Sequence, residues 1–254
     1  MERSSVYLAS DVHLGAIREE NERAFLSWLE EAAGVASRVV LNGDLFDYWF
    51  EYRSVIPQGY TRTLGLLARI VDSGVEVDLL GGNHDWWGGR YLEEEVGVRF
   101  HRDPVRMDLA GRTVLVAHGD GLGPGDLAYK ALKACLRSSP LRWLYRWLHP
   151  DIGARIAQRA SSTMDRGTPT EGERRRSQVL RDWAHGILAS DPALDMVVLG
   201  HTHIPVLEES GPGRHYLNCG DWVYHRTFAV LSPGGEPRLL EWSGSGSHRP
   251  WAGE

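Results

Sequence analysis

Five short polar clusters in this sequence carry side chains that could bind metal ions or move protons. The densest is Gly82-Asn83-His84-Asp85, where an amide, an imidazole and a carboxylate occupy three consecutive positions. It directly follows the apolar run at residues 75–80, which predicts a buried strand. Asn and Asp are common turn formers, so this cluster alone would indicate only a turn. Four similar clusters elsewhere make a functional site the stronger interpretation.

The other clusters also follow predicted strands. They are Asp11-Val12-His13, Gly43-Asp44, His118-Gly119-Asp120 and Gly200-His201-Thr202-His203. Any single residue here would more often be an ordinary structural group. Taken together, the five strand ends offer two carboxylates, one amide and four imidazoles, from Asp11, His13, Asp44, Asn83, His118, His201 and His203. Seven ligands are too many for a single zinc ion, but their number and chemistry suit two Mn, Fe or Zn ions that share a carboxylate. Two such ions about 3.5–4 Å apart can hold a phosphoryl group and generate hydroxide.

The elements that must position these residues alternate along the chain. Apolar runs predict strands near residues 6–9, 39–41, 75–80, 113–117 and 196–199, and antiparallel strands near 216–218, 228–231 and 239–241. Helical periodicity appears at residues 21–33, 64–71, 91–96 and 179–188, with Gly34 as the expected stop of the first helix. This alternation predicts an α/β fold with sheets flanked by helices. The polar clusters lie at carboxyl ends of strands, where such sheets place their sites.

Composition narrows the class of protein. The chain has 254 residues, 42% of them hydrophobic, and no apolar run long enough to span a bilayer. Its N-terminus shows no signal-peptide pattern, and the two cysteines have no metal-ligand spacing, so we expect a cytoplasmic protein. The net charge of −6 argues against a general nucleic-acid binder. The segment 126–176 is the exception, with eleven basic against five acidic residues.

The five clusters, in this order, resemble the motifs of the calcineurin-like metallophosphoesterase family. The resemblance runs from about residue 5 to about residue 231 and includes Gly43-Asp44-x-x-Asp47. It implies a two-sheet β-sandwich flanked by helices over residues 1–242, with an inserted helical lid at 121–178. It also implies that one metal is held by Asp11, His13 and His203, and the other by Asn83, His118 and His201. By the same pattern Asp44 bridges the ions, and Asp47 and Asp85 orient ligands. His84 would face the substrate, either as a proton donor to the leaving oxygen or as a stabiliser of phosphoryl charge.

Finer features resemble the UDP-2,3-diacylglucosamine diphosphatases of lipid A biosynthesis. These are the aromatic run after Asp44 and the stretch from His118 to Lys130. The resemblance implies hydrolysis of the substrate diphosphate to 2,3-diacylglucosamine 1-phosphate and UMP. The ligand set accepts Mn, Fe and Zn alike, and of these we expect Mn²⁺. We expect the substrate to contact His84 together with the lid residues Asp126, Tyr129, Lys130, Arg159 and Ser162.

The basic insert has a composition that suits a lipid substrate. Trp143 and Trp147 are four residues apart, beside Arg142 and Arg146, in a segment rich in leucine. Such a helix fits an anionic diphosphate with acyl chains and an anionic membrane surface, which predicts a peripheral position on the inner face of the inner membrane. The alternative is an ordinary lid with a solvated basic face. The aromatic run at 46–50 is expected in the core, and the glycine- and serine-rich tail at 243–254 is expected to be disordered.

One departure keeps a second function open. The common proteobacterial diphosphatases carry Arg in the third motif, where this chain has His84. A soluble phosphodiesterase acting on nucleotides or other small diesters is therefore the alternative enzyme. A protein-interaction scaffold without catalysis is a third hypothesis, but all seven candidate ligands are present. A nuclease is disfavoured by the acidic charge outside the insert. The sequence gives no indication of oligomeric state.

Overall fold

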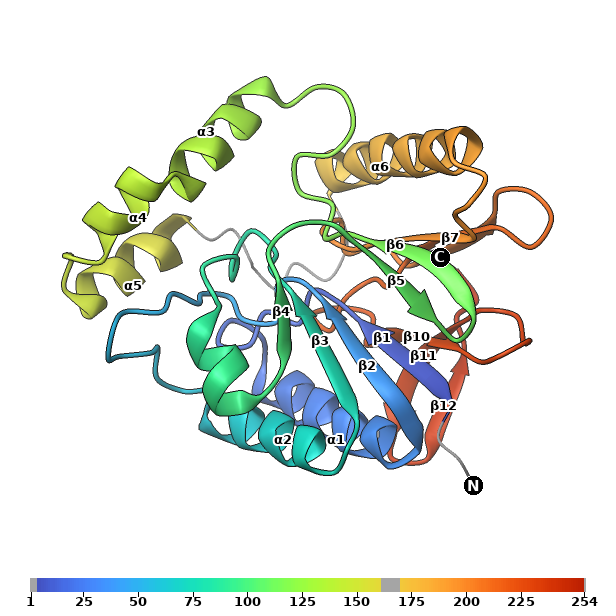
Figure 1. Cartoon of the computed structure of the whole chain (residues 1–254), viewed down its shortest axis with the longest axis horizontal. Helices are drawn as coiled ribbons and strands as arrows, with labels where there is room; N and C mark the ends of the chain where they lie inside the picture. Colours follow the sequence, from blue (N-terminus) through green and yellow to red (C-terminus); the bar gives the residue numbers. More distant parts are fainter. Residues whose placement is uncertain (1–3, 161–169, 254) are drawn as a thin grey trace.

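Two β-sheets form the centre of the protein. The computed structural model describes residues 4–160 and 170–253. The larger sheet has the strand order β12-β11-β10-β1-β2-β3-β4 (Figure 1). Its strands are β1 (Ser5–Ala9), β2 (Ala36–Asn42), β3 (Glu76–Leu80), β4 (Arg99–His101), β10 (Thr227–Leu231), β11 (Arg238–Gly244) and β12 (Ser247–Pro250). The smaller sheet has the order β5-β6-β7-β9-β8. It comprises β5 (Val105–Leu109), β6 (Arg112–Val116), β7 (Met196–Leu199), β8 (Val206–Glu209) and β9 (His215–Asn218).

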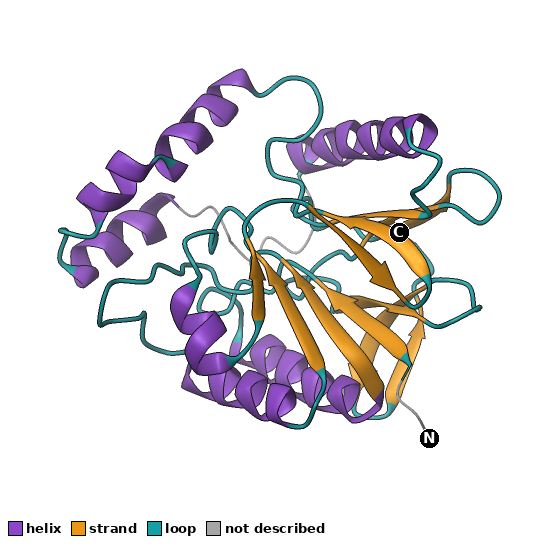
Figure 2. Ribbon diagram, in the orientation of Figure 1, coloured by secondary structure: helices purple, strands orange, loops and turns teal. Residues whose placement is uncertain are grey.

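Helices cover the outer face of each sheet, giving four layers. On the larger sheet lie α1 (Glu19–Val35) and α2 (Thr61–Asp72), whose apolar faces join the strands in one core. A second core fills the space between the sheets, where Leu8 and Val40 meet Val116 and Val198. Helix α6 (Glu171–Ser190) packs Leu180 and its apolar neighbours on the smaller sheet (Figure 2). The expected two-sheet sandwich flanked by helices is confirmed.

The parallel strands bring the polar clusters to one edge. Strands β1, β2 and β3 are parallel neighbours in the larger sheet, and β6, β7 and β9 are parallel neighbours in the smaller one. Their carboxyl ends therefore meet where the two sheets converge, so residues from distant parts of the chain become neighbours.

Several local predictions need correction. Helix α1 continues through Gly34 and ends at Val35, because the chain turns only at Ala36, which is already extended. Strand β9 is antiparallel to β8, as the sequence pattern predicted, but it is parallel to its other neighbour, β7. Strands β4, β5, β8 and β12 were not predicted from the sequence. The segment Leu92–Val96 is helical as expected, with the wide turn of a π-helix.

The expectation of a disordered tail from residue 243 is wrong for the described residues. Strand β11 continues to Gly244, and β12 pairs with it through a tight turn. Gly244 and Gly246 both have positive φ, which glycine adopts without strain, so the composition that suggested disorder instead supplies a hairpin turn. The backbone N–H of Trp251 also donates to the carbonyl of Leu239.

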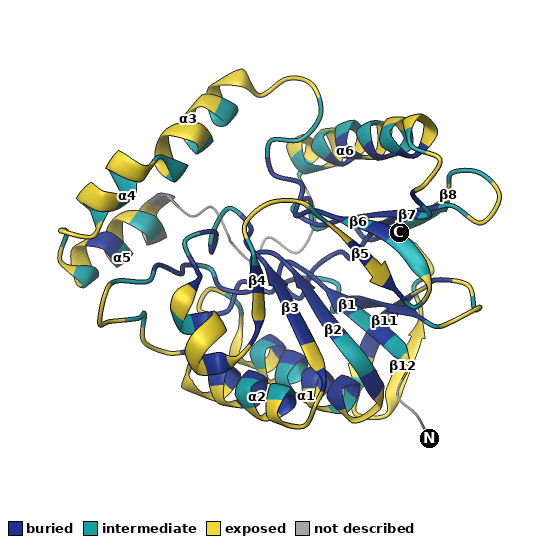
Figure 3. Ribbon diagram, viewed as in Figure 1, coloured by how far each residue is buried: buried dark blue, intermediate teal, exposed yellow. Residues whose placement is uncertain are grey.

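The insert protrudes from the sandwich as three helices. They are α3 (Leu127–Arg137), α4 (Ser139–Tyr145) and α5 (Pro150–Ala160). Figure 3 shows that these helices are largely exposed, in contrast to the buried strands. Eight of the ten large apolar side chains that are exposed in the described part of the chain lie between residues 127 and 156. Helix α6 begins inside the expected insert but belongs to the sandwich. Among the described residues, no helix has the length and apolar character needed to cross a membrane.

Candidate metal centre

The backbone around the candidate ligands is strained. Eight non-glycine residues in the described part of the chain have positive φ, and five of them are Asp11, His13, Asp44, His201 and His203. Each such residue costs about 1–3 kcal/mol and is kept only where the surroundings enforce it. The backbone also passes so close to Asp44 at Gly82 that a Cβ there would overlap the Asp44 carboxylate. These unusual backbone conformations therefore direct the candidate ligands toward one another.

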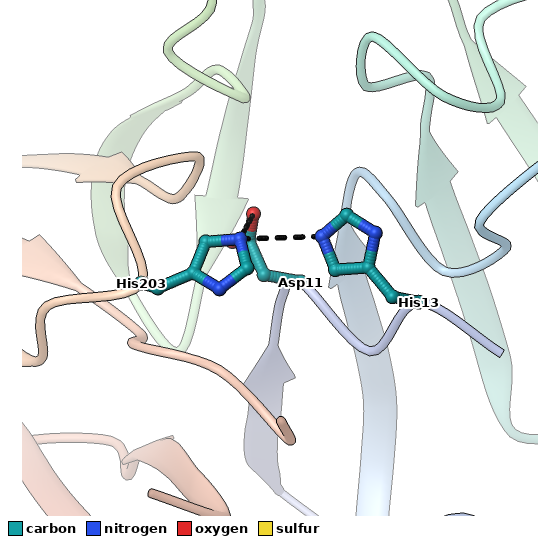
Figure 4. Close-up of side chains that lie close together, drawn as sticks. All are labelled: Asp11, His13 and His203. Atoms are coloured by element: carbon teal, nitrogen blue, oxygen red, sulfur yellow. Dashed lines mark hydrogen bonds and ion pairs between the residues drawn. The ribbon is translucent and has the colours of Figure 1, made fainter. Parts of the chain in front are cut away.

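Asp11, His13 and His203 form the first group of possible ligands. The Nε2 atoms of His13 and His203 lie 3.2 Å apart, and His203 Nε2 lies 3.5 Å from Asp11 Oδ1 (Figure 4). Asp11 and His13 follow β1, and His203 follows β7, so this group joins the two sheets. Asp11 also accepts the backbone N–H of His201 at 2.9 Å, which fixes the neighbouring motif. All three can offer one atom each to a common ion.

Asp44, His118 and His201 form the second group. Asp44 Oδ2 lies 3.2 Å from His118 Nε2 and 3.8 Å from His13 Nε2, so this oxygen faces both groups. Asn83 Oδ1 lies 3.3 Å from the same His118 nitrogen. The other nitrogen of His118 is 3.0 Å from the carbonyl of Asn42, which orients the ring. All seven residues predicted from the sequence are thus gathered within one cluster.

His84 borders this cluster. Its Nδ1 donates to the carbonyl of Asp47 at 2.8 Å, and its backbone N–H donates to Asp44 Oδ1 at 2.9 Å. It also forms a third possible ligand group with His13 and Asp44. Asp47 lies between two imidazoles, with Oδ1 3.5 Å from Nδ1 of both His13 and His84. The side chain of His84 lines a cavity beside the cluster, where it can reach a bound molecule.

Asp85 connects its own motif to the loop that carries Asp44. Its buried carboxylate accepts the backbone N–H groups of Gly82 and Leu45, both at 2.7 Å. Weaker bonds at 3.3 Å run from the N–H groups of Asp44 and Phe46. This carboxylate therefore fixes the loop that presents Asp44.

The electrostatics of the cluster suit a bound cation. Burial would by itself raise the pKa of Asp44, but the imidazoles of His118 and His84 hold it well below its ordinary value. Burial disfavours a charged His118, yet the Asp44 carboxylate raises its pKa to about 10. Burial and the charge on His118 together lower the pKa of His201 to about 3, and burial raises that of Asp11 to about 6. The buried Asp44 carboxylate thus favours a positive charge beside it, which divalent ions would supply when bound.

Helix α3 of the insert is tied to the fourth motif by Asp120. This buried carboxylate lies 2.8 Å from Lys133 Nζ and 3.1 Å from a guanidinium nitrogen of Arg137. Tyr129, predicted to contact substrate, donates its hydroxyl to the same carboxylate at 3.3 Å. Arg137 also donates to the carbonyl of Gly82 at 3.3 Å, next to Asn83. Two cations of the insert therefore stand beside the third motif.

The remaining predicted substrate residues lie elsewhere. Asp126 forms an ion pair with Arg176 of α6 at 2.9 Å, and Lys130 donates to the carbonyl of Gly123, so both have partners within the protein. Arg159 is exposed on α5, and Ser162 lies outside the described residues. Among the described residues, neither Asp126, Lys130 nor Arg159 lines the cavity beside His84.

Sequence reasoning missed several residues around the centre. Asp221 follows β9, is fully buried, and accepts from His225 Nδ1 at 2.9 Å. Its Oδ2 lies 3.7 Å from Nδ1 of His203, the ring nitrogen that faces away from the other candidate ligands. The signal was present, since Gly220-Asp221 is another polar pair after a strand. Lys133 and Arg137 carried no comparable local signal, because only the folded insert brings them to Asp120.

Two cavities flank the cluster, both bounded by the insert. The larger, of about 900 Å³, lies beside Asp47 and Tyr48 and reaches His149 and Ala154. The smaller, of about 220 Å³, runs from Asn83 and His84 to apolar residues of α3 and α5, with Leu132, Leu136 and Ala157 in its wall. Phe46 and Trp49 of the aromatic run are buried and stack at 4.4 Å, which confirms their predicted place in the core.

Comparison with known proteins agrees with this geometry. The family model described as calcineurin-like phosphoesterase matches residues 4–205. The chain belongs to this family. A protein named UDP-2,3-diacylglucosamine hydrolase from Porphyromonas gingivalis is 32% identical over 250 residues, covering 90% of this chain and 94% of the relative. Hydrolases of the same name from Aeromonas salmonicida and Pseudomonas aeruginosa are 30% and 32% identical, covering 92% and 86% of this chain and 92% and 91% of the relatives.

Proposed function

We propose that this phosphoesterase hydrolyses the diphosphate of UDP-2,3-diacylglucosamine to 2,3-diacylglucosamine 1-phosphate and UMP, a step of lipid A biosynthesis. The proposal rests on the sequence identity of about 30% between this chain and hydrolases named for this substrate. The aligned region extends over about nine-tenths of the relatives' length. The match is therefore much broader than the five motifs. Cavities beneath a basic, apolar insert give the substrate a place to bind.

The donor set fits two divalent ions. We assign Asp11, His13 and His203 to one ion and Asn83, His118 and His201 to the other. Asp44 is assigned to both, because one of its oxygens faces both groups. Mixed imidazole, carboxylate and amide donors accept Mn²⁺, Fe²⁺ and Zn²⁺, and Mn²⁺ is our choice among them. When bound, such ions supply a hydroxide near neutral pH and neutralise charge on the phosphoryl group.

The protein's own groups position the substrate and serve the leaving group. Hydrolysis adds water across the diphosphate, so one P–O bond forms, one breaks, and the leaving phosphate oxygen needs charge stabilisation or a proton. His84 faces the cavity at this point, and the carboxylates around it raise the pKa of its imidazole against the effect of burial. It is therefore able to donate a hydrogen bond or proton there. Asn83 beside it, and Tyr129 with Arg137, border the same space.

The two cavities suit the two halves of the substrate. The smaller cavity offers Leu132, Leu136 and Trp87 to an acyl chain. The larger one offers polar groups of Asp47, Gln58 and His149 among tyrosine rings, which suit the uridine half. The insert also exposes Trp143 and Trp147 at 62% and 74%, beside basic residues. This surface supports peripheral contact with an anionic membrane at the cytoplasmic face of the inner membrane.

A soluble phosphodiesterase for small diesters is the alternative function, and His84 in the third motif is the observation that favours it. The deciding experiment is a Mn²⁺-supplemented turnover assay on UDP-2,3-diacylglucosamine, with UDP-sugars lacking acyl chains as controls and products identified by mass. We expect UMP from the acylated substrate only. Equal hydrolysis of the controls, or none of the lipid substrate, would favour the alternative.

A further inference from the structure

A third cavity, separate from the two that flank the candidate metal centre, is lined by arginines. It measures about 300 Å³ and lies between α4, the segment after β2 and the end of β4. Five arginines line it, namely Arg53, Arg90, Arg102, Arg142 and Arg146. None of the seven candidate metal ligands borders this space. The core and the insert both contribute to it, so its charge depends on how they fold together.

The positive charge of this arginine cavity is poorly compensated. Its one acidic neighbour, Glu51, accepts backbone N–H groups of Gly89 at 2.8 Å and Tyr91 at 3.0 Å. Arg90 pairs with Glu94 at 2.7 Å. Among the described residues, the other four arginines have no carboxylate within ion-pair distance, and Nε of Arg142 is buried without a hydrogen-bond partner. Several guanidinium groups without counter-charge around one hollow favour an anion, and their planar forks match phosphate oxygens.

The surroundings indicate where that phosphate comes from. Trp143 and Trp147 directly follow Arg142 and Arg146, and their rings contact each other at 5.9 Å while remaining mostly exposed. Tryptophan is enriched at the level of lipid headgroups, where its ring meets apolar chains on one side and water on the other. Guanidinium groups one residue away would then lie at the depth of the headgroup phosphates.

We propose that the arginine cavity binds the phosphate headgroup of an anionic membrane lipid, with Trp143 and Trp147 in the interface beside it. This deepens the membrane contact of the proposed function and rests on it in that respect. The site joins Arg53 and Arg102 of the core to Arg142 and Arg146 of the insert. Lipid binding would therefore hold the insert against the core, next to the catalytic cavities.

Vesicle flotation of the full-length protein tests this proposal. The probes are phosphatidylcholine vesicles with and without phosphatidylglycerol, and the variants are Arg53→Gln and Arg142→Gln. Arg155→Gln is the matched control, because Arg155 is exposed on α5, outside the cavity, and loses the same charge. We expect each cavity variant to bind the anionic vesicles about fivefold more weakly, and the control to bind as wild type does.

Three results would overturn the proposal. They are wild-type binding by both cavity variants, an equal loss in Arg155→Gln, which would indicate diffuse attraction, and displacement of the protein from vesicles by UMP, which would assign the cavity to a nucleotide. Arg53 is exposed, so its variant stays informative even if Arg142→Gln, whose guanidinium lies 5.5 Å above Trp86, folds poorly. Flotation needs no turnover, so failure here leaves the proposed reaction standing, and failure of the turnover assay leaves this result interpretable.

Discussion

Asp44 is the residue on which the proposed two-ion centre depends. One of its oxygens lies within 3.8 Å of imidazole nitrogens from both ligand groups. We expect Asp44→Asn to lower metal occupancy and abolish activity, because a neutral amide cannot balance two divalent ions. Metal content per chain by elemental analysis is the measurement, with Asp72→Asn, an exposed change on α2, as the control. Full occupancy in Asp44→Asn would rule out the bridging role.

His84 should act on the substrate and leave the metals in place. We expect His84→Ala to keep its metal content while turnover falls by roughly 10²–10⁴, the range for lost acid–base help. His84→Arg separates the two possible roles, because arginine supplies charge but does not donate its proton. Recovery of turnover in His84→Arg would indicate charge stabilisation, and wild-type turnover in His84→Ala would remove His84 from the mechanism.

Asp221 should act through His203. Its carboxylate faces the ring nitrogen of His203 that points away from the cluster, an arrangement that orients ligating imidazoles in metal sites. We expect Asp221→Asn to weaken metal binding by about 10–100-fold, measured by competition with a chelator. The amide oxygen can still accept from the backbone of His225, so the fold should persist. Unchanged metal affinity would show that Asp221 only supports the loop.

At the scale of elements, helix α3 connects the insert to the cavity that His84 lines. Leu132 and Leu136 line the smaller cavity, although both are partly exposed, at 55% and 39%. We expect Leu132→Ser and Leu136→Ser to slow turnover of the acylated substrate with little change in stability, since surface changes usually stay within about 0.5 kcal/mol. Leu127→Ser on the same helix, 79% exposed and outside the cavity, is the control. Equal effects of all three changes would contradict an acyl site here.

At the scale of the whole molecule, the sequence predicted those features that are encoded in a short continuous segment. Each ligand motif followed its own apolar strand, so the seven candidates could be found before the fold was known. Lys133 and Arg137 could not, because their approach to Asp120 depends on how the insert folds. Strand β4 has only three residues, and β12 is exposed along its length, so neither shows a hydrophobic pattern. The tail was misjudged because composition does not show that β11 offers an edge for pairing.

The two sheets bring their strand ends together at one edge, where we propose a centre for two metal ions. Titration of the metal-free protein with Mn²⁺ tests this centre, with release of UMP from UDP-2,3-diacylglucosamine followed against equivalents of metal per chain. We expect activity to rise to a plateau at two equivalents. Full activity at one equivalent, or without added metal in the presence of chelator, would contradict it.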